Sequence, residues 1–179
     1  MVAELVEIQQ VPALLARYEQ TAAAKRVAYE QPWTELVLRL LETTGVKQAR
    51  PHAPGFLGFA LGLDLETEQQ ALERLQQAGI VERSRDCWVV TGSLTVDTRA
   101  DREALSLLRR HWTEVALRRM AAPRDNDWFA YNLISLSRRD LDRVRSRLQE
   151  AFREIRAIVA ASEPCEVAAL INLHLINWE

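Results

Sequence analysis

The stretch Asp64–Gly92, DLETEQQALERLQQAGIVERSRDCWVVTG, decides the fold of this chain. Its first half predicts a helix, because Asp64 can supply a capping oxygen and apolar residues then recur every three or four positions up to a glycine. These apolar residues are Ala71, Leu72, Leu75 and Ala78. The second half has β-branched and aromatic residues on both sides of Ser84-Arg85-Asp86, which predicts a two-stranded hairpin.

Two further helices are expected upstream of this stretch. The first has one apolar face, made of Trp33, Leu36, Val37, Leu40 and Leu41, and we expect it to end at Gly45. The second, shorter helix covers Pro54–Leu61 and ends at Gly62. Three helices followed directly by a hairpin is the element order of a winged helix, which we place at residues 29–98, after a helical leader over residues 1–28.

The C-terminal part, residues 99–179, predicts helix, strand, helix and strand. A long helix should end before Pro123, and Trp128–Leu136 reads as a strand. Ser137 and Asp140 have the spacing of a capping box that opens a second long helix, and Glu166–Trp178 reads as another strand. The last three elements could form a parallel βαβ unit. The fold class expected for the whole chain is therefore α+β.

The second long helix has a narrow apolar seam at alternating intervals of three and four residues. The seam consists of Leu141, Val144, Leu148, Ala151, Ile155 and Ile158. We expect a homodimer in which Leu141, Val144, Leu148 and Ile155 are buried across a two-fold axis. The alternative is that the helix containing Trp112 covers the seam within one chain.

Composition places the chain among ordinary globular proteins. Of its 179 residues, 48% are hydrophobic and 27% are charged, and no apolar run approaches the roughly 18 residues of a membrane span. The N-terminus lacks the basic start of a secretory signal, so we expect a cytoplasmic protein with no membrane partner. Cys87 and Cys165 have no ligand neighbours at metal spacing, and we interpret both as buried thiols.

The order of several short motifs resembles a known family over about Tyr29–Ile176. These motifs are the Trp33 helix, the winged helix, the helix containing His111, Leu133–Ser137 (LISLS), Phe152-Arg153 and Leu170–Leu175. The chain resembles the domain of unknown function that follows a Cro/repressor-type helix-turn-helix in uncharacterised bacterial transcription regulators. The resemblance implies the architecture of a regulator with an unknown effector, and DNA as a partner of the full-length protein through an N-terminal domain that is missing here.

DNA binding by the winged helix itself would depend on a few polar and basic side chains. The candidates are Gln69, Gln70 and Arg74 on the third helix, and Arg83 and Arg85 on the hairpin. The same helix has Glu66, Glu68 and Glu73, which would repel phosphates, and Glu82 and Asp86 offset the hairpin arginines. We therefore expect that the winged helix does not read DNA, and we keep a self-sufficient winged-helix DNA-binding transcription factor as the alternative.

Catalytic motifs are not evident in the sequence. His52, His111 and His174 are isolated, and the sequence contains no glycine-rich phosphate loop, nucleophile elbow or metal-ligand spacing. The arginines of the two late helices have acidic neighbours three positions away, such as Asp140 with Arg143, Asp142 with Arg145 and Glu150 with Arg153. We expect a regulatory or oligomerisation region that is not an enzyme and that has no cofactor and no metal.

Overall fold

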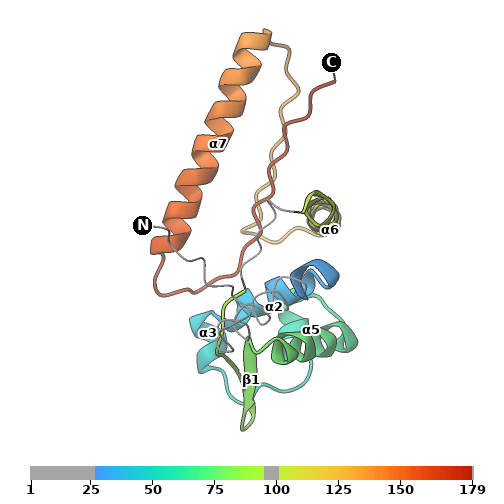
Figure 1. The fold of residues 1–179 in the computed structure, drawn as a ribbon, viewed down its shortest axis with the longest axis vertical. Coiled ribbons are helices and arrows are strands. Elements are labelled where there is room, and N and C mark those ends of the chain that lie inside the picture. The colour runs from blue at the N-terminus through green and yellow to red at the C-terminus, as the bar shows by residue number, and fades with distance from the viewer. Residues whose placement is uncertain (1–26, 95–100, 179) are drawn as a thin grey trace, which may run out of the picture. The chain divides into compact units, whose positions relative to one another are not determined.

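A computed structural model describes residues 27–94 and 101–178 of the chain (Figure 1). These residues form two compact units, one comprising the described residues up to His111 together with Glu166–Ala168, the other comprising Trp112–Cys165 and the residues from Ala169 onward. The helices and strands are α2 (Trp33–Leu41), α3 (Thr44–Gln48), α4 (Phe56–Leu61), α5 (Leu65–Gln77), β1 (Val81–Ser84), β2 (Cys87–Val90), α6 (Arg102–Ala121) and α7 (Arg138–Ala161). The predicted leader falls mostly outside the described residues, as does the predicted boundary after residue 98.

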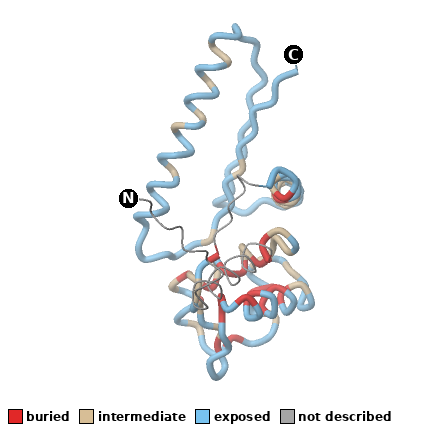
Figure 2. Tube along the Cα trace, in the orientation of Figure 1, coloured by how far each residue is buried: buried red, intermediate tan, exposed pale blue. Residues whose placement is uncertain are grey.

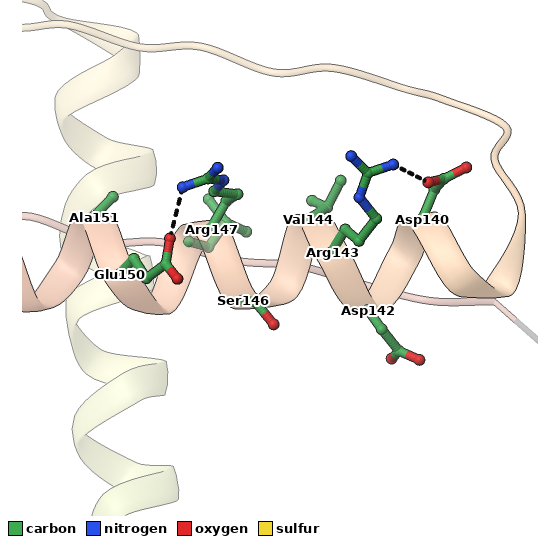
Figure 3. Close-up of a pocket in the computed structure, with 9 residues that line it drawn as sticks. Asp140, Asp142, Arg143, Val144, Ser146, Arg147, Glu150 and Ala151 are labelled. Carbon is green, nitrogen blue, oxygen red and sulfur yellow. Dashed lines mark hydrogen bonds and ion pairs between the residues drawn. The ribbon is translucent and has the colours of Figure 1, made fainter.

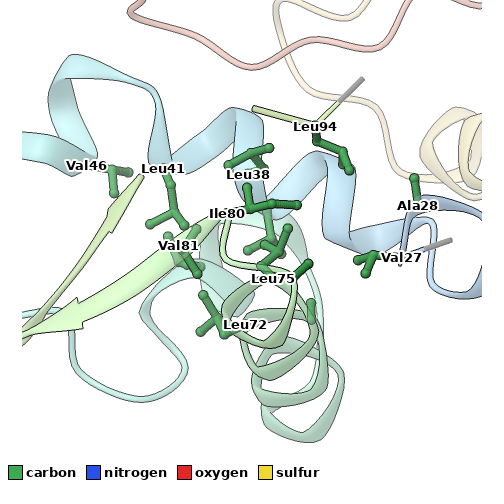
Figure 4. Close-up of a cluster of buried hydrophobic side chains, with 14 residues drawn as sticks. Val27, Ala28, Leu38, Leu41, Val46, Leu72, Leu75, Ile80, Val81 and Leu94 are labelled. Atoms are coloured by element: carbon green, nitrogen blue, oxygen red, sulfur yellow. The ribbon is translucent and has the colours of Figure 1, made fainter. Parts of the chain in front are cut away.

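The core of the first unit lies where α2 and α5 pack together next to the hairpin (Figure 4). Leu38, Leu75 and Ile80 are at most 2% exposed there. Burial of a side chain of this size stabilises the folded state by roughly 1.5–3 kcal/mol, so these residues contribute much of the unit's stability. Val27 and Ala28, at the end of the predicted leader, are also buried in this core.

The hairpin forms as the sequence predicts. Strands β1 and β2 are antiparallel, with Val81 opposite Val90 and Ser84 opposite Cys87. The two residues between the strands form the turn, and Arg85 there has φ 54°, the left-handed conformation that tight hairpins require. Cys87 is buried, as expected.

Two of the predicted helix boundaries, at Gly62 and Asp64, are confirmed, and the one at Gly45 is wrong. Gly62 caps α4 in the left-handed conformation, and Asp64 caps α5 by accepting a hydrogen bond from the Thr67 backbone N–H, both as predicted. Gly45 does not end α2, since that helix stops at Leu41 and Gly45 lies inside α3, which the sequence did not indicate. Thr43 is extended and lets the chain turn into this additional short helix, in which Val46 is buried.

The prediction of two C-terminal strands is wrong. Residues 128–136 and 166–178 contain neither helix nor strand, and the β1–β2 pair is the only sheet among residues 27–94 and 101–178. A strand needs a neighbouring backbone to complete its hydrogen bonds, and apolar side chains alone do not supply one. The expected parallel βαβ unit is therefore not formed, and the coarser description holds: a helix-rich fold with a small antiparallel sheet.

The second unit contains no buried residue between Trp112 and Trp178, in contrast to the first unit (Figure 2). Helix α7 forms as predicted, and its N-cap Ser137 accepts a hydrogen bond from the Asp140 backbone N–H. Cys165 is exposed, which corrects the expectation of a buried thiol, because it lies after α7 in residues 162–178, none of which is buried.

Candidate nucleic-acid interface and helical seam

Helix α5 presents two chemically different faces. Its apolar residues Ala71, Leu72 and Leu75 are in the core. The opposite face exposes polar side chains, namely Glu66, Gln69, Gln70, Glu73, Arg74, Gln76 and Gln77. This exposed face is the one that would have to meet a nucleic acid if the helix bound one.

Glu68 is not on that exposed face, which changes the charge that α5 offers to solvent. The side chain is 2% exposed, and its carboxylate accepts hydrogen bonds from the backbone N–H groups of Gly55, at 2.9 Å, and of Gly58. A Cβ on Gly58 would lie 2.9 Å from this carboxylate, so only glycine leaves room for the contact. Glu68 thus ties α5 to the start of α4, and the exposed face of α5 is less acidic than the sequence suggested.

Two of the predicted base-reading side chains on α5 have partners within the protein. The Gln70 side-chain amide donates to Glu66 at 3.0 Å and accepts from Gln31 at 3.3 Å. Arg74 lies 3.8 Å from the Glu30 carboxylate in an exposed ion pair. Gln69 is exposed. Of the three candidates on α5, therefore, Gln70 and Arg74 would have to exchange internal contacts for contacts with DNA.

The hairpin arginines differ from each other. The Arg83 guanidinium lies over the Trp88 ring, 5.2 Å from its centroid, and donates to the His52 carbonyl at 3.5 Å. Arg85 is exposed at the turn, next to Asp86. The structure therefore places Arg83 against the protein body, and it leaves Arg85 as the basic side chain at the tip.

His52 is a structural residue whose role sequence reasoning missed. It is 3% exposed, and its Nδ1 accepts a hydrogen bond from the Trp88 backbone N–H at 3.0 Å. Because Nδ1 accepts, the ring proton is on Nε2, which donates to the Val46 carbonyl at 3.0 Å. The ring also stacks on Phe56. One histidine thereby joins α3, α4 and β2, a link between distant positions that no local sequence signal marks.

The carboxylates with shifted pKa values have structural causes. Burial raises the pKa of Glu35 above its usual 4.5, against the opposing effect of Arg39. Hydrogen bonds from Thr67 lower the pKa of Asp64, and hydrogen bonds from Ser137 and Arg143 lower the pKa of Asp140. The last two carboxylates lie at helix N-termini, where a negative charge is favoured, and Asp64 is exposed whereas Asp140 is half-buried. None of these shifts belongs to a convergent set of reactive groups.

Helix α7 carries the seam predicted from the sequence. Leu141, Val144, Leu148 and Ile155 are half-buried, and Ile158 is 69% exposed. The shallow hollow drawn in Figure 3 is lined by residues of α7 alone, so it is an open face of one helix and not an enclosed cavity. The ion pairs Asp140–Arg143 and Asp142–Arg145 form as predicted, whereas Glu150 pairs with Arg147 in place of Arg153.

Residues 27–94 and 101–178 contain neither a cluster of metal-ligating side chains nor a helix that could span a membrane. No group of three or more histidine, cysteine, aspartate or glutamate side chains in that part of the chain is placed to hold a metal ion. In the same residues, no helix is both long and apolar enough to cross a bilayer. The ring of His111 meets the ring of Trp33 edge to face, with 5.1 Å between the two ring centroids.

Comparison with known proteins assigns the chain to a family. Residues 19–176 match the family described as a domain of unknown function (DUF4423). The chain therefore belongs to this family, which confirms the expectation of a domain of unknown function. No curated protein matches the chain, and no solved structure matches it.

Proposed function

We propose that this chain is the non-catalytic regulatory and oligomerisation region of a bacterial transcription regulator. In this proposal residues 29–98 form a winged helix, with α2, α4 and α5 as its three helices, β1 and β2 as its wing, and α3 as an added turn. The order of these elements and the antiparallel register of the hairpin support this assignment. A Cro/repressor-type helix-turn-helix N-terminal to this region would then contact DNA.

The internal contacts of the basic and amide side chains carry the proposal that the winged helix does not read DNA. Gln70, Arg74 and Arg83 are each held by a neighbour within the protein. The exposed charges of α5 are Glu66, Glu73 and Arg74, a net charge of −1 even without Glu68. A carboxylate about 4 Å from a phosphate costs roughly 1 kcal/mol in water, which is comparable to the gain from a hydrogen bond to a base.

Fluorescence anisotropy with a random-sequence duplex at low salt tests this proposal. We expect the 179-residue chain to bind no tighter than the micromolar range, with a shallow dependence on salt concentration. The doubly substituted chain R83A/R85A is the matched variant, and its binding should equal that of the wild type. Tight, steeply salt-dependent binding that R83A/R85A abolishes would overturn the proposal and favour the self-sufficient DNA-binding factor.

A further inference from the structure

The seam of α7 has the spacing of a coiled-coil interface. Its six residues follow one another at intervals of three, four, three, four and three, which is a heptad repeat with apolar residues at both core positions. No residue of α7 is buried in the single chain. An apolar stripe of this length on a helix of 24 residues is stable in water only when another surface covers it.

We propose that α7 pairs antiparallel with α7 of a second copy of this chain, seam against seam. This inference rests on the proposed oligomerisation role and deepens it by naming the surface, the occupant and the orientation. A second copy is the partner because one two-fold rotation sets three features of α7 opposite matching features of the other copy. These features are the seam, the ends of the helix and the charged residues beside the seam.

The helix ends and the seam select the same register. A two-fold axis that crosses α7 at its midpoint, between Gln149 and Glu150, pairs the helix with its copy over the full length from Arg138 to Ala161. The same rotation sets each seam residue opposite a seam residue of the other copy. The facing pairs are Leu141 with Ile158, Val144 with Ile155, and Leu148 with Ala151. No seam residue is left without a counterpart.

Side-chain size favours the antiparallel arrangement over the parallel one. The antiparallel register places the small Ala151 opposite the large Leu148, so that consecutive layers hold similar volumes. A parallel pair would stack Ala151 on its own copy, next to a layer in which two Leu148 side chains meet. An alanine layer between larger layers leaves a gap, and unfilled volume in an interface is destabilising.

The residues beside the seam also match in this orientation. Arg147 lies next to Glu154 of the second copy, and the two-fold axis repeats the pair, which gives two attractive contacts between the helices. The Arg147 side chain is 85% exposed and forms a surface ion pair with Glu150 of the same helix. In a parallel pair, Arg147 would face Phe152 and Glu154 would face Val159. Antiparallel helices also oppose their macrodipoles favourably.

Sedimentation equilibrium of the whole chain with a substitution in the seam tests the surface. The wild type should be a dimer at tens of micromolar, and Leu148→Glu should raise the dimer dissociation constant by about a hundredfold or more, because two charges are buried at the centre. Ser146→Glu adds the same charge on the opposite face of α7 and should leave the dimer intact. A monomeric wild type at about 0.1 mM, or a dimer insensitive to Leu148→Glu, overturns the proposal.

Charge reversal tests the orientation without placing a charge in the core. Arg147→Glu should weaken the dimer about tenfold, since two attractive pairs become repulsive, and R147E/E154R should restore it. In a parallel pair, residue 140 would face Arg145, so Asp140→Lys would weaken a parallel dimer. If Asp140→Lys weakens the dimer and Arg147→Glu has no effect, the antiparallel arrangement is wrong. Circular dichroism of each variant checks that α7 remains helical.

The DNA titration keeps this inference separate from the proposed function. A chain that pairs through α7 and also binds duplex tightly through the hairpin would contradict the proposed function alone. A chain that does not bind duplex and forms a dimer insensitive to Leu148→Glu would contradict the α7 pairing alone, whereas a monomeric chain would contradict the proposed oligomerisation role as well.

Discussion

The two units of this protein use similar helices in different ways. Helix α5 of the first unit and helix α7 of the second both have apolar residues at intervals of three and four. Leu75 of α5 is fully buried, whereas α7 contains no buried residue. The difference shows that sequence periodicity identifies the apolar face of a helix. Whether another surface packs against that face depends on the rest of the fold.

In the first unit, the apolar face of α5 packs against other elements of the same unit. Helices α2 and α5 and the hairpin enclose one cluster of aliphatic side chains, and Glu68 and His52 connect the surrounding loops by hydrogen bonds. The second unit exposes large apolar side chains, such as Trp128 and Tyr131, each more than 80% exposed. Exposure on this scale is typical of surfaces that meet a partner.

The largest effect on the free energy of unfolding is expected when a buried leucine is truncated to alanine. Leu75→Ala should lower the free energy of unfolding of the first unit by about 3 kcal/mol, because it leaves a cavity in a filled core. Leu117→Ala, the same truncation at a residue of the second unit that is 59% exposed, should change the free energy of unfolding of that unit by less than about 0.5 kcal/mol. Urea unfolding measures both, with hydrogen exchange of the α5 amides for the first variant and of the amides around Leu117 for the second. Equal losses of unfolding free energy in the two variants would mean that the two units are packed equally well around these leucines.

A smaller effect is expected from the buried carboxylate. Glu68→Gln keeps the size of the side chain but replaces one acceptor oxygen with a donor that faces a backbone N–H, which should cost about 1–3 kcal/mol. Glu73→Gln, on the exposed face of the same helix, is the control and should be nearly neutral. Thermal unfolding compares the two variants. A neutral Glu68→Gln would show that the loop before α4 does not depend on this contact.

The smallest effect is expected at the exposed cap of α5. The pKa of Asp64 is lowered by its hydrogen bonds to Thr67, so its ionised form stabilises the folded state above the usual value of 3.8, and this contribution is lost as the pH falls through the folded-state pKa. Asp64→Ala should therefore be slightly less stable than the wild type at pH 7. The difference should shrink in acid, as urea unfolding at several pH values would reveal. A gap independent of pH would mean that the charge does not contribute.

Local signals sufficed for most of the helices and for the hairpin. Gly62 and Asp64 mark the end of α4 and the start of α5, and Ser137 marks the start of α7, because a cap depends on residues only a few positions apart. The seam of α7 and the arginines at the hairpin were found in the same way. The family resemblance was also carried by short motifs in order, and the family match confirms that the chain is a domain of unknown function.

Contacts between distant residues were not predictable in this way. The sequence indicated Glu68 as a surface charge, yet its carboxylate closes the loop before α4, ten positions or more away. His52 looked isolated because its partners lie in α3 and β2. The two C-terminal strands were expected from residue type alone, and they did not form because no neighbouring backbone pairs with them.

The sequence by itself determined most of the helices, α3 being the exception, together with most of their ends and the apolar face of each. These properties follow from interactions within one or two turns of the chain. Only the tertiary structure decided that Glu68 is buried and that no residue of α7 is buried among the described parts of the chain. It also decided that Gln70 accepts a hydrogen bond from Gln31, that Arg74 pairs with Glu30 and that Arg83 donates to the His52 carbonyl. Those outcomes depend on which surfaces meet in three dimensions, because burial and desolvation are set by neighbours that are distant in sequence.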